Sequence, residues 1–185
     1  MKRNFVMVVV LSAMLLTQSA VAEIKTIPGK PTYEETIAFI KSQYSSGTEF
    51  KALYENSYVT VEVQKIIKVY FNIDCIMEAK YQIQKTFLYP NGHREKFVDL
   101  IVSKDKDFRD VEGIAVLGNG GKGKGDTWIY GLLFVEKNQK IEQPWDLPVA
   151  VKNGSGVVRE IKEYKIYKAF NHLRNLCGAP EPLEF

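Results

Sequence analysis

The chain has little of the chemistry that enzymes and metal sites usually use. Its 185 residues include two histidines and two cysteines, which is too few for a zinc site at any common motif spacing. Nucleophilic catalysis needs a base beside Ser, Thr or Cys, and His93 and His172 lie in no such motif. We therefore expect no catalytic residue, no metal and no cofactor. Two carboxylates far apart in the sequence could still meet in a cleft, so an enzyme of that kind stays open.

An excess of charge of one sign is missing as well. The chain has 25 basic and 22 acidic residues, and its first 22 residues hold two of the basic and none of the acidic ones. The remainder is therefore almost neutral. This balance argues against a protein that nucleic acid or a membrane surface attracts by bulk charge.

Long apolar runs are absent outside the N-terminus. There, two basic residues precede an apolar stretch from Phe5 to Leu16, and Ala20-Val21-Ala22 follows it. This order is typical of a secretory signal peptide cleaved after Ala22, and the stretch is short for an uncleaved membrane anchor. We expect residues 1–22 to be removed and residues 23–185 to form one domain, periplasmic or secreted, with no membrane insertion after cleavage.

Both cysteines, Cys75 and Cys177, lie in the part expected to be exported. An oxidising compartment favours their pairing. A disulfide between them would close a loop of about a hundred residues and contribute roughly 4–5 kcal/mol in the chain-entropy model. The alternative is a pair of buried free thiols.

The longest helical period runs from Glu160 to Gly178, where Gly178 and Pro180 end it. Six apolar residues form one stripe at spacings of three and four: Ile166, Ala169, Phe170, Leu173, Leu176 and Cys177. Five polar residues lie mostly off the centre of that stripe: Lys162, Glu163, Lys168, Arg174 and Asn175. Because a lone helix cannot bury such a stripe, we expect this helix to cover a sheet or the mouth of a barrel.

A second helix is predicted near the start of the mature chain. Thr32 and Glu35 have the spacing of a capping box that opens a helix. The apolar residues that follow share one face of that helix: Tyr33, Ile37, Ile40 and Tyr44.

Between the two helices the apolar period changes to two, which indicates strands. The patterns predict strands at 58–63, 66–73, 81–89, 97–102, 111–117, 128–135 and 149–151. Residues 80–102 form a predicted hairpin around Pro90-Asn91-Gly92-His93, and Ser103 to Asp110 form a predicted charged loop. The fold class is therefore α+β: an N-terminal helix, about seven largely antiparallel strands in a sandwich or partly open barrel, and a C-terminal capping helix.

The order of these elements, from about residue 50 to the closing helix at Lys168–Gly178, resembles that of small exported bacterial domains of pleckstrin-homology-like shape. The N-terminal helix lies outside this pattern. The resemblance implies a binding scaffold, because that fold is mostly non-catalytic.

A glycine-rich segment, Gly118 to Gly125, formally matches a dinucleotide fingerprint. The context contradicts a nucleotide site, because a strand follows instead of a helix, and Gly125 stands where a phosphate loop needs Ser or Thr. A flexible connector and a partner-contacting loop both stay open. The candidate contact residues are Asn119, Gly120, Gly121, Lys122, Gly123, Lys124 and Trp128.

The acidic run Asp105, Asp107, Asp110 and Glu112 suggests a calcium loop at first sight. However, Arg109 occupies a ligand position, and no glutamate closes the loop at the required spacing. A solvated charged turn is the favoured interpretation.

These features favour an exported, non-catalytic binding protein. The hypothesis we favour is an inhibitor or immunity protein that binds an envelope-acting toxic enzyme. A domain made rigid by a disulfide, with an adaptable glycine-rich loop, suits such binding. The expected partner is a protein, with no role for nucleic acid. The alternative is a carrier whose β-sheet encloses an apolar pocket for a lipid or other small ligand, lined by some of the ten tyrosines and ten phenylalanines.

Overall fold

The computed structural model describes residues 24–54, 59–120, 126–136, 145–153 and 158–179. Its elements are α1 (Tyr33–Gln43), β1 (Glu49–Leu53), β2 (Val59–Phe71), β3 (Ile76–Leu88), β4 (Arg94–Asp107), β5 (Val111–Gly120), β6 (Thr127–Glu136), β7 (Leu147–Asn153), α2 (Val158–Glu163) and α3 (Lys165–Leu176). The predicted α+β class, with seven antiparallel strands between N- and C-terminal helices, is confirmed. None of the helices in the described ranges is long and apolar enough to span a membrane.

The predicted capping box opens α1. The Thr32 hydroxyl accepts a hydrogen bond from the Glu35 amide, and the Thr32 amide donates to Oε2 of Glu35 at 2.8 Å. These two bonds satisfy donors that a helix start leaves unpaired. Tyr33 and Ile40 are buried on the face that the sequence assigned to the core.

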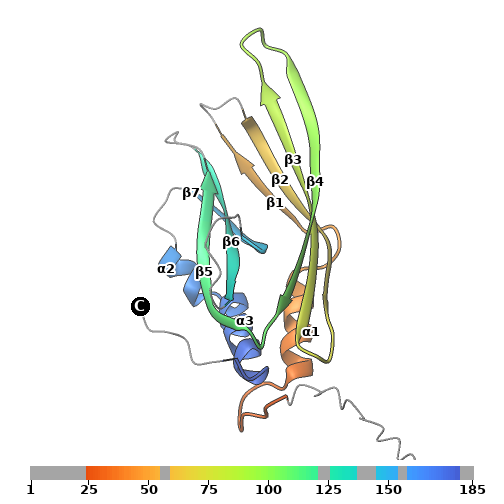
Figure 1. Cartoon of the computed structure of the whole chain (residues 1–185). Coiled ribbons are helices and arrows are strands. Elements are labelled where there is room, and N and C mark those ends of the chain that lie inside the picture. Colours follow the sequence, from red (N-terminus) through yellow and green to blue (C-terminus); the bar gives the residue numbers. More distant parts are fainter. Residues whose placement is uncertain (1–23, 55–58, 121–125, 137–144, 154–157, 180–185) are drawn as a thin grey trace, which may run out of the picture.

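The strands form two antiparallel meanders (Figure 1). One sheet has the order β1-β2-β3-β4 and the other β5-β6-β7. The sheets diverge from the end where the turn between β4 and β5 joins them, with α1 and α3 at that same end. The amide of Leu53 also donates to Oγ1 of Thr127 at 2.7 Å, which ties β1 to β6. The arrangement is a two-sheet sandwich, and β1 holds it together near the hairpin ends through β6 and a small buried cluster of Ala52, Tyr54, Ile129 and Trp145.

Two predictions of strand bounds were wrong. The predicted strands at 58–63 and 66–73 form the single strand β2, whose pairing with β3 continues through a register shift between Ile66 and Lys68. The predicted loop at Ser103–Asp110 is strand as far as Asp107. The charged residues of this segment suggested an exposed loop. However, Lys106 is only 6% exposed on the inner face of β4, where Glu136 and Asp146 are its ion-pair partners.

The predicted C-terminal helix is two helices rather than one. Tyr164 interrupts it with an extended backbone (φ −64°, ψ 142°) and serves as the N-cap of α3. Phe170 of α3 occupies the centre of the core, with its ring centroid 4.9 Å from that of Phe134 and 6.0 Å from that of Phe108. Leu173 and Leu176 are fully buried, as the apolar stripe predicted.

Arg174 was placed off the apolar stripe, and this prediction was wrong. Its side chain is fully buried, and Nε donates to the backbone oxygen of Val111 at 2.5 Å. The guanidinium thereby links α3 to the first residue of β5. Helical spacing alone cannot reveal such an acceptor, because it belongs to a residue 63 positions away.

The disulfide between Cys75 and Cys177 is confirmed, with the two Cα atoms 5.9 Å apart. It joins the β2–β3 turn to the residue that follows α3. Cys75 has φ +63°, a left-handed conformation that L-residues other than Asn and Asp seldom adopt. Asn72 supports this turn, since its Oδ1 accepts from the amides of Asp74 and Ile76.

Candidate protein-binding surface

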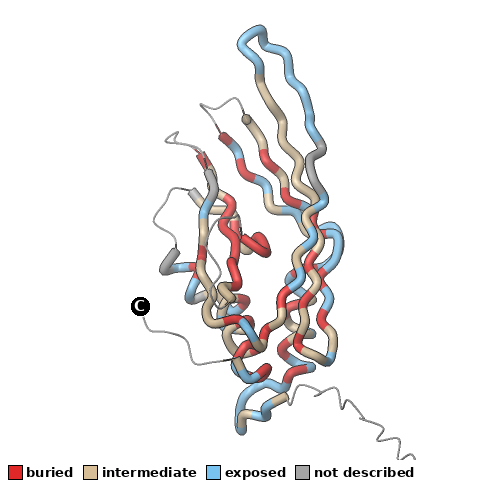
Figure 2. Tube along the Cα trace, in the orientation of Figure 1, coloured by how far each residue is buried: buried red, intermediate tan, exposed pale blue. Residues whose placement is uncertain are grey.

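The ends of three hairpins lie at one end of the molecule, opposite α1 and α3 (Figure 1). The β1–β2 hairpin ends between Leu53 and Val59, and the β5–β6 hairpin ends between Gly120 and Thr127. The β3–β4 hairpin extends further than both, and we call its residues 87–97 the β3–β4 tip. Most of this tip forms a continuous exposed stretch (Figure 2).

A tight turn gives the tip a defined backbone. The amide of Tyr89 donates to the oxygen of His93, and the amide of Gly92 donates to the oxygen of Tyr89, both at 2.9 Å. Gly92 has φ +80°, which explains the glycine at this position. Oδ1 of Asn91 accepts from the His93 amide at 3.0 Å. The predicted turn at Pro90–His93 is therefore present and internally hydrogen-bonded.

Aromatic side chains cluster on the tip. Phe87 and Phe97 make an edge-to-face contact with centroids 5.2 Å apart, and the rings of Tyr89 and His93 stack at 6.0 Å. Tyr89 and Phe97 are each 38% exposed. Oε2 of Glu95 accepts from the Tyr89 hydroxyl at 3.1 Å, and this bond raises the pKa of Tyr89. Preordered aromatic rings of this kind lose little conformational entropy when they contact a partner.

The charges on the tip are mostly positive. Arg94 and Lys96 are exposed and, by their register with Leu88 and Thr86, project from the outer face of the sheet. Phe87 pairs with Glu95, the one acidic residue of the tip. An aromatic inner face beside a basic outer face suits an acidic cleft or groove on a partner.

The glycine-rich segment lies only partly in the described ranges. Asn119 and Gly120 are the last residues of β5 and pair with Ile129 and Trp128. Gly121, Lys122, Gly123 and Lys124 lie outside the described residues. Trp128 is partly buried and stacks on Tyr130 with centroids 6.3 Å apart. It therefore supports the base of this hairpin rather than standing free.

Close packing holds this base in place. A Cβ atom at Gly118 would lie 2.7 Å from Cε1 of Tyr130, so any larger residue there would displace the ring. A Cβ atom at Gly131 would lie 1.9 Å from Cγ of Trp145, which requires glycine at that site. The β5–β6 hairpin thus approaches the surface on a rigid support.

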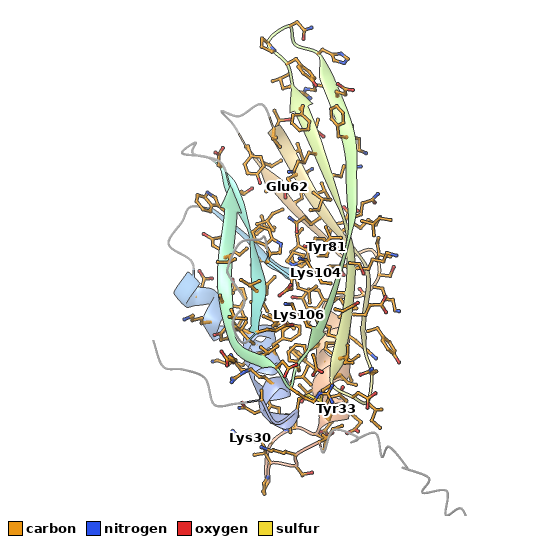
Figure 3. All side chains as sticks on the ribbon, in the orientation of Figure 1. Lys30, Tyr33, Glu62, Tyr81, Lys104 and Lys106 are labelled. Carbon is orange, nitrogen blue, oxygen red and sulfur yellow. A yellow bond between two sulfur atoms is a disulfide. The ribbon has the colours of Figure 1, made fainter. Side chains whose placement is uncertain are left out.

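A buried hydrogen-bond network connects the two sheets beneath the hairpin ends. Nε1 of Trp145 donates to Oε1 of Gln64 at 3.1 Å, and Nε2 of Gln64 donates to Oε1 of Glu62 at 2.8 Å. The Tyr81 hydroxyl donates to the oxygen of Trp145 at 3.2 Å. Tyr54 contacts Oε2 of Glu62. Glu62 and Tyr81 project into the space between the sheets (Figure 3), so the network fixes their spacing.

Two of the three buried carboxylates in the described ranges, those of Glu62 and Asp146, serve as structural acceptors; the third belongs to Asp126. Glu62 accepts from Gln64 and Tyr54, as described above. Oδ2 of Asp146 accepts from the Phe134 amide at 2.8 Å and lies 3.9 Å from Nζ of Lys106. Burial raises the pKa of Asp146, while the Phe134 amide and Lys106 oppose that change. Both acids are therefore engaged by donors of the protein itself.

The remaining candidate residues have structural partners. His93 lies in the tip, whereas Nε2 of the partly buried His172 is 2.7 Å from the oxygen of Pro31. In the acidic run, Asp107 binds the side chain of Arg109, which lowers the pKa of Asp107. Within the described ranges, no group of three or more His, Cys, Asp or Glu residues is placed to hold a metal ion.

Sequence reasoning missed the β3–β4 tip as a surface. It predicted the hairpin, but the available signal, three aromatic residues around a polar turn, is equally typical of cross-strand pairs in a core. The lower part of the space between the sheets, which the carrier hypothesis assigned to a ligand, contains the packed rings of Phe108, Phe134 and Phe170.

Comparison of the chain with protein-family models, curated proteins and solved structures finds no match. The resemblance to domains of pleckstrin-homology-like shape therefore stays a prediction.

Proposed function

We propose that the protein is an exported, non-catalytic binding protein of the inhibitor or immunity type, which contacts a protein partner through its hairpin ends. The observation that carries this proposal is the position of the β3–β4 tip. Its exposed aromatic and basic side chains extend beyond the body and lie at the same end as the glycine-rich hairpin. Binding residues on loops held by a rigid scaffold are a common arrangement in recognition proteins.

Two further features support the proposal. The Cys75–Cys177 disulfide suits an oxidising compartment outside the cytoplasm. The interior network around Trp145 limits movement between the sheets, so that little order has to be gained when the partner binds. The segment between Gly120 and Thr127, most of which lies outside the described residues, contains two further basic residues by sequence, Lys122 and Lys124. An envelope-acting enzyme with an acidic cleft is the partner that this surface fits.

The experiment is a pull-down from an envelope extract of the source organism, followed by measurement of the dissociation constant for any stoichiometric partner. Tyr89→Ala and Phe97→Ala should each weaken binding by about tenfold or more, as expected of central aromatic contacts. Tyr70→Ala is the matched control, because Tyr70 is 46% exposed on β2 and lies outside the tip. Absence of a stoichiometric protein partner, or equal effects of the tip and control variants, would reject the proposal.

A charge reversal separates the two hairpins. Arg94→Glu with Lys96→Glu tests the tip, and Lys122→Glu with Lys124→Glu tests the glycine-rich segment. Each pair should weaken binding to an acidic cleft and leave the melting temperature nearly unchanged. Should affinity survive reversal at Lys122 and Lys124 alone, the segment is only a connector and the tip carries the contact.

A further inference from the structure

A groove of about 750 Å³ lies between α1 and α3, at the end of the molecule opposite the hairpin ends. The two helices contact each other, and α1 with the segment before it forms one wall while α3 forms the other. The residues that line the groove are Lys30, Pro31, Glu35, Thr36, Phe39, Lys165, Lys168, Ala169, Asn171, His172 and Asn175. The groove is remote from the proposed protein-binding surface, so the two can be tested independently.

The floor of the groove is apolar. Phe39 and Ala169 are partly buried and pack against the main core from opposite walls. The buried Thr36 uses its hydroxyl to donate to the oxygen of Thr32 at 2.7 Å, so this hydroxyl is already satisfied. A ligand on the floor would therefore meet mostly carbon atoms, which favours a hydrocarbon.

The rim of the groove is basic. Lys30, Lys165 and Lys168 are exposed around it. Figure 3 places Lys30 at this end of the molecule. Glu35 is the one carboxylate among the lining residues, and the capping box already engages it with the Thr32 amide. The net charge of the rim therefore favours an anionic group.

A hydrogen bond sets the position of one end of the groove. Nε2 of His172 on α3 lies 2.7 Å from the oxygen of Pro31, just before α1. A carbonyl oxygen only accepts, so Nε2 carries the proton in this contact. The bond holds α3 to the start of α1, and the groove is thereby formed before any ligand arrives.

We propose that this groove binds a long-chain carboxylate, with the hydrocarbon chain on the floor and the carboxylate at the lysine rim. The volume of the groove lies within the range of about 300–1,000 Å³ that small-molecule sites occupy. An acidic amphipathic helix is the competing occupant. Such a helix needs a row of apolar pockets for anchors at i, i+4 and i+7, whereas the floor offers mainly Phe39 and Ala169.

The test is calorimetric titration of the protein, purified after expression of the complete chain, with dodecanoate below its micelle concentration. We expect saturable binding of one dodecanoate per chain, weaker binding at high salt, and weaker binding of the uncharged methyl ester. Lys165→Glu with Lys168→Glu should weaken dodecanoate binding by about tenfold or more. Lys51→Glu with Lys162→Glu is the matched control, since both lysines are exposed outside the groove and binding should change less than about twofold.

A second pair of variants tests the floor. Ala169→Trp should fill the groove and abolish dodecanoate binding, whereas Ala38→Trp on the exposed side of α1 should not. Thermal unfolding of each variant shows whether it is folded, and a poorly folded Ala169→Trp can be replaced by Ala169→Leu. No saturable dodecanoate binding, or equal binding by the groove and control variants, overturns the proposal. Binding of an acidic helical peptide without binding of dodecanoate assigns the groove to a protein partner instead.

Discussion

Removal of the Cys75–Cys177 disulfide should cost a large share of the stability of this protein. The two cysteines are 102 residues apart, and the chain-entropy model gives about 4.7 kcal/mol for a loop of that length. Cys75→Ala with Cys177→Ala removes the bond without placing a hydroxyl at two buried sites, which are 1% and 4% exposed. For a chain of this size, the melting temperature should fall by roughly 10–20 °C.

The backbone at Cys75 provides a second, independent measurement. Its φ of +63° costs an L-residue about 1–2 kcal/mol, and glycine avoids that cost. Cys75→Gly with Cys177→Ala should therefore be at least as stable as Cys75→Ala with Cys177→Ala, even after the greater freedom of glycine in the unfolded chain and the loss of one buried methyl group are subtracted. Both double variants lack the disulfide, so their difference does not depend on the cross-link.

Urea unfolding with and without reductant measures both effects. Reduction should bring the wild-type protein to within about 1 kcal/mol of the alanine double variant, and should leave the double variants unchanged. A wild-type protein whose unfolding midpoint does not respond to complete reduction would refute the cross-link argument. A glycine variant less stable than the alanine variant would refute the left-handed conformation at residue 75.

Four further substitutions test the core and one surface ion pair. Tyr44→Phe should raise the free energy of unfolding by about 1–3 kcal/mol, since no described residue hydrogen-bonds the buried Tyr44 hydroxyl. Tyr33→Phe should lower it by about 0.5–1.5 kcal/mol, since this hydroxyl donates to a backbone oxygen at 2.5 Å; equal urea midpoints for the two would contradict the argument. Leu173→Ala should cost about 2–5 kcal/mol in the same assay, because Leu173 is fully buried, and a loss below about 1 kcal/mol would mean that the faces of α3 are assigned wrongly. Arg109 lowers the pKa of Asp107 in the folded state, so the ionised Asp107 stabilises the fold. This stabilisation is fully present above the ordinary Asp pKa and is lost as the pH falls through the lowered pKa. Urea midpoints across acidic pH should show this loss in the wild type but not in Asp107→Asn.

Local features of the fold were predictable because their causes are local. The capping box at Thr32 and Glu35 needs only the residues of one helical turn. The turn at Pro90–His93 likewise depends on proline, asparagine and glycine in a row. The disulfide was predictable from the cysteine count, since a chain with two cysteines has one possible intramolecular pair.

Charged residues inside the sandwich were not predictable in the same way. Lys106 and Arg174 look like surface residues in a strand or helix pattern, yet both are buried. The carboxylates that pair with Lys106 belong to Glu136 of β6 and to Asp146, the residue before β7. The backbone oxygen that accepts from Arg174 lies at the start of β5. The side-chain period of a strand or helix shows on which face of that element a residue lies. It does not show which other element packs against that face.

By itself, the sequence determined most of this protein's parts: two helical regions, the strands other than β1 with their tight turns, and one pair of cysteines. Hydrogen bonds and apolar periods within a few residues specify such elements. Only the tertiary structure decided that three hairpin ends lie at the same end of the molecule and that Trp145 contacts Gln64 across 81 residues. It also decided that α1 and α3 enclose a basic groove. The physical reason is that each of these sites is made by side chains distant in the chain, whose meeting depends on how the two sheets and the helices pack.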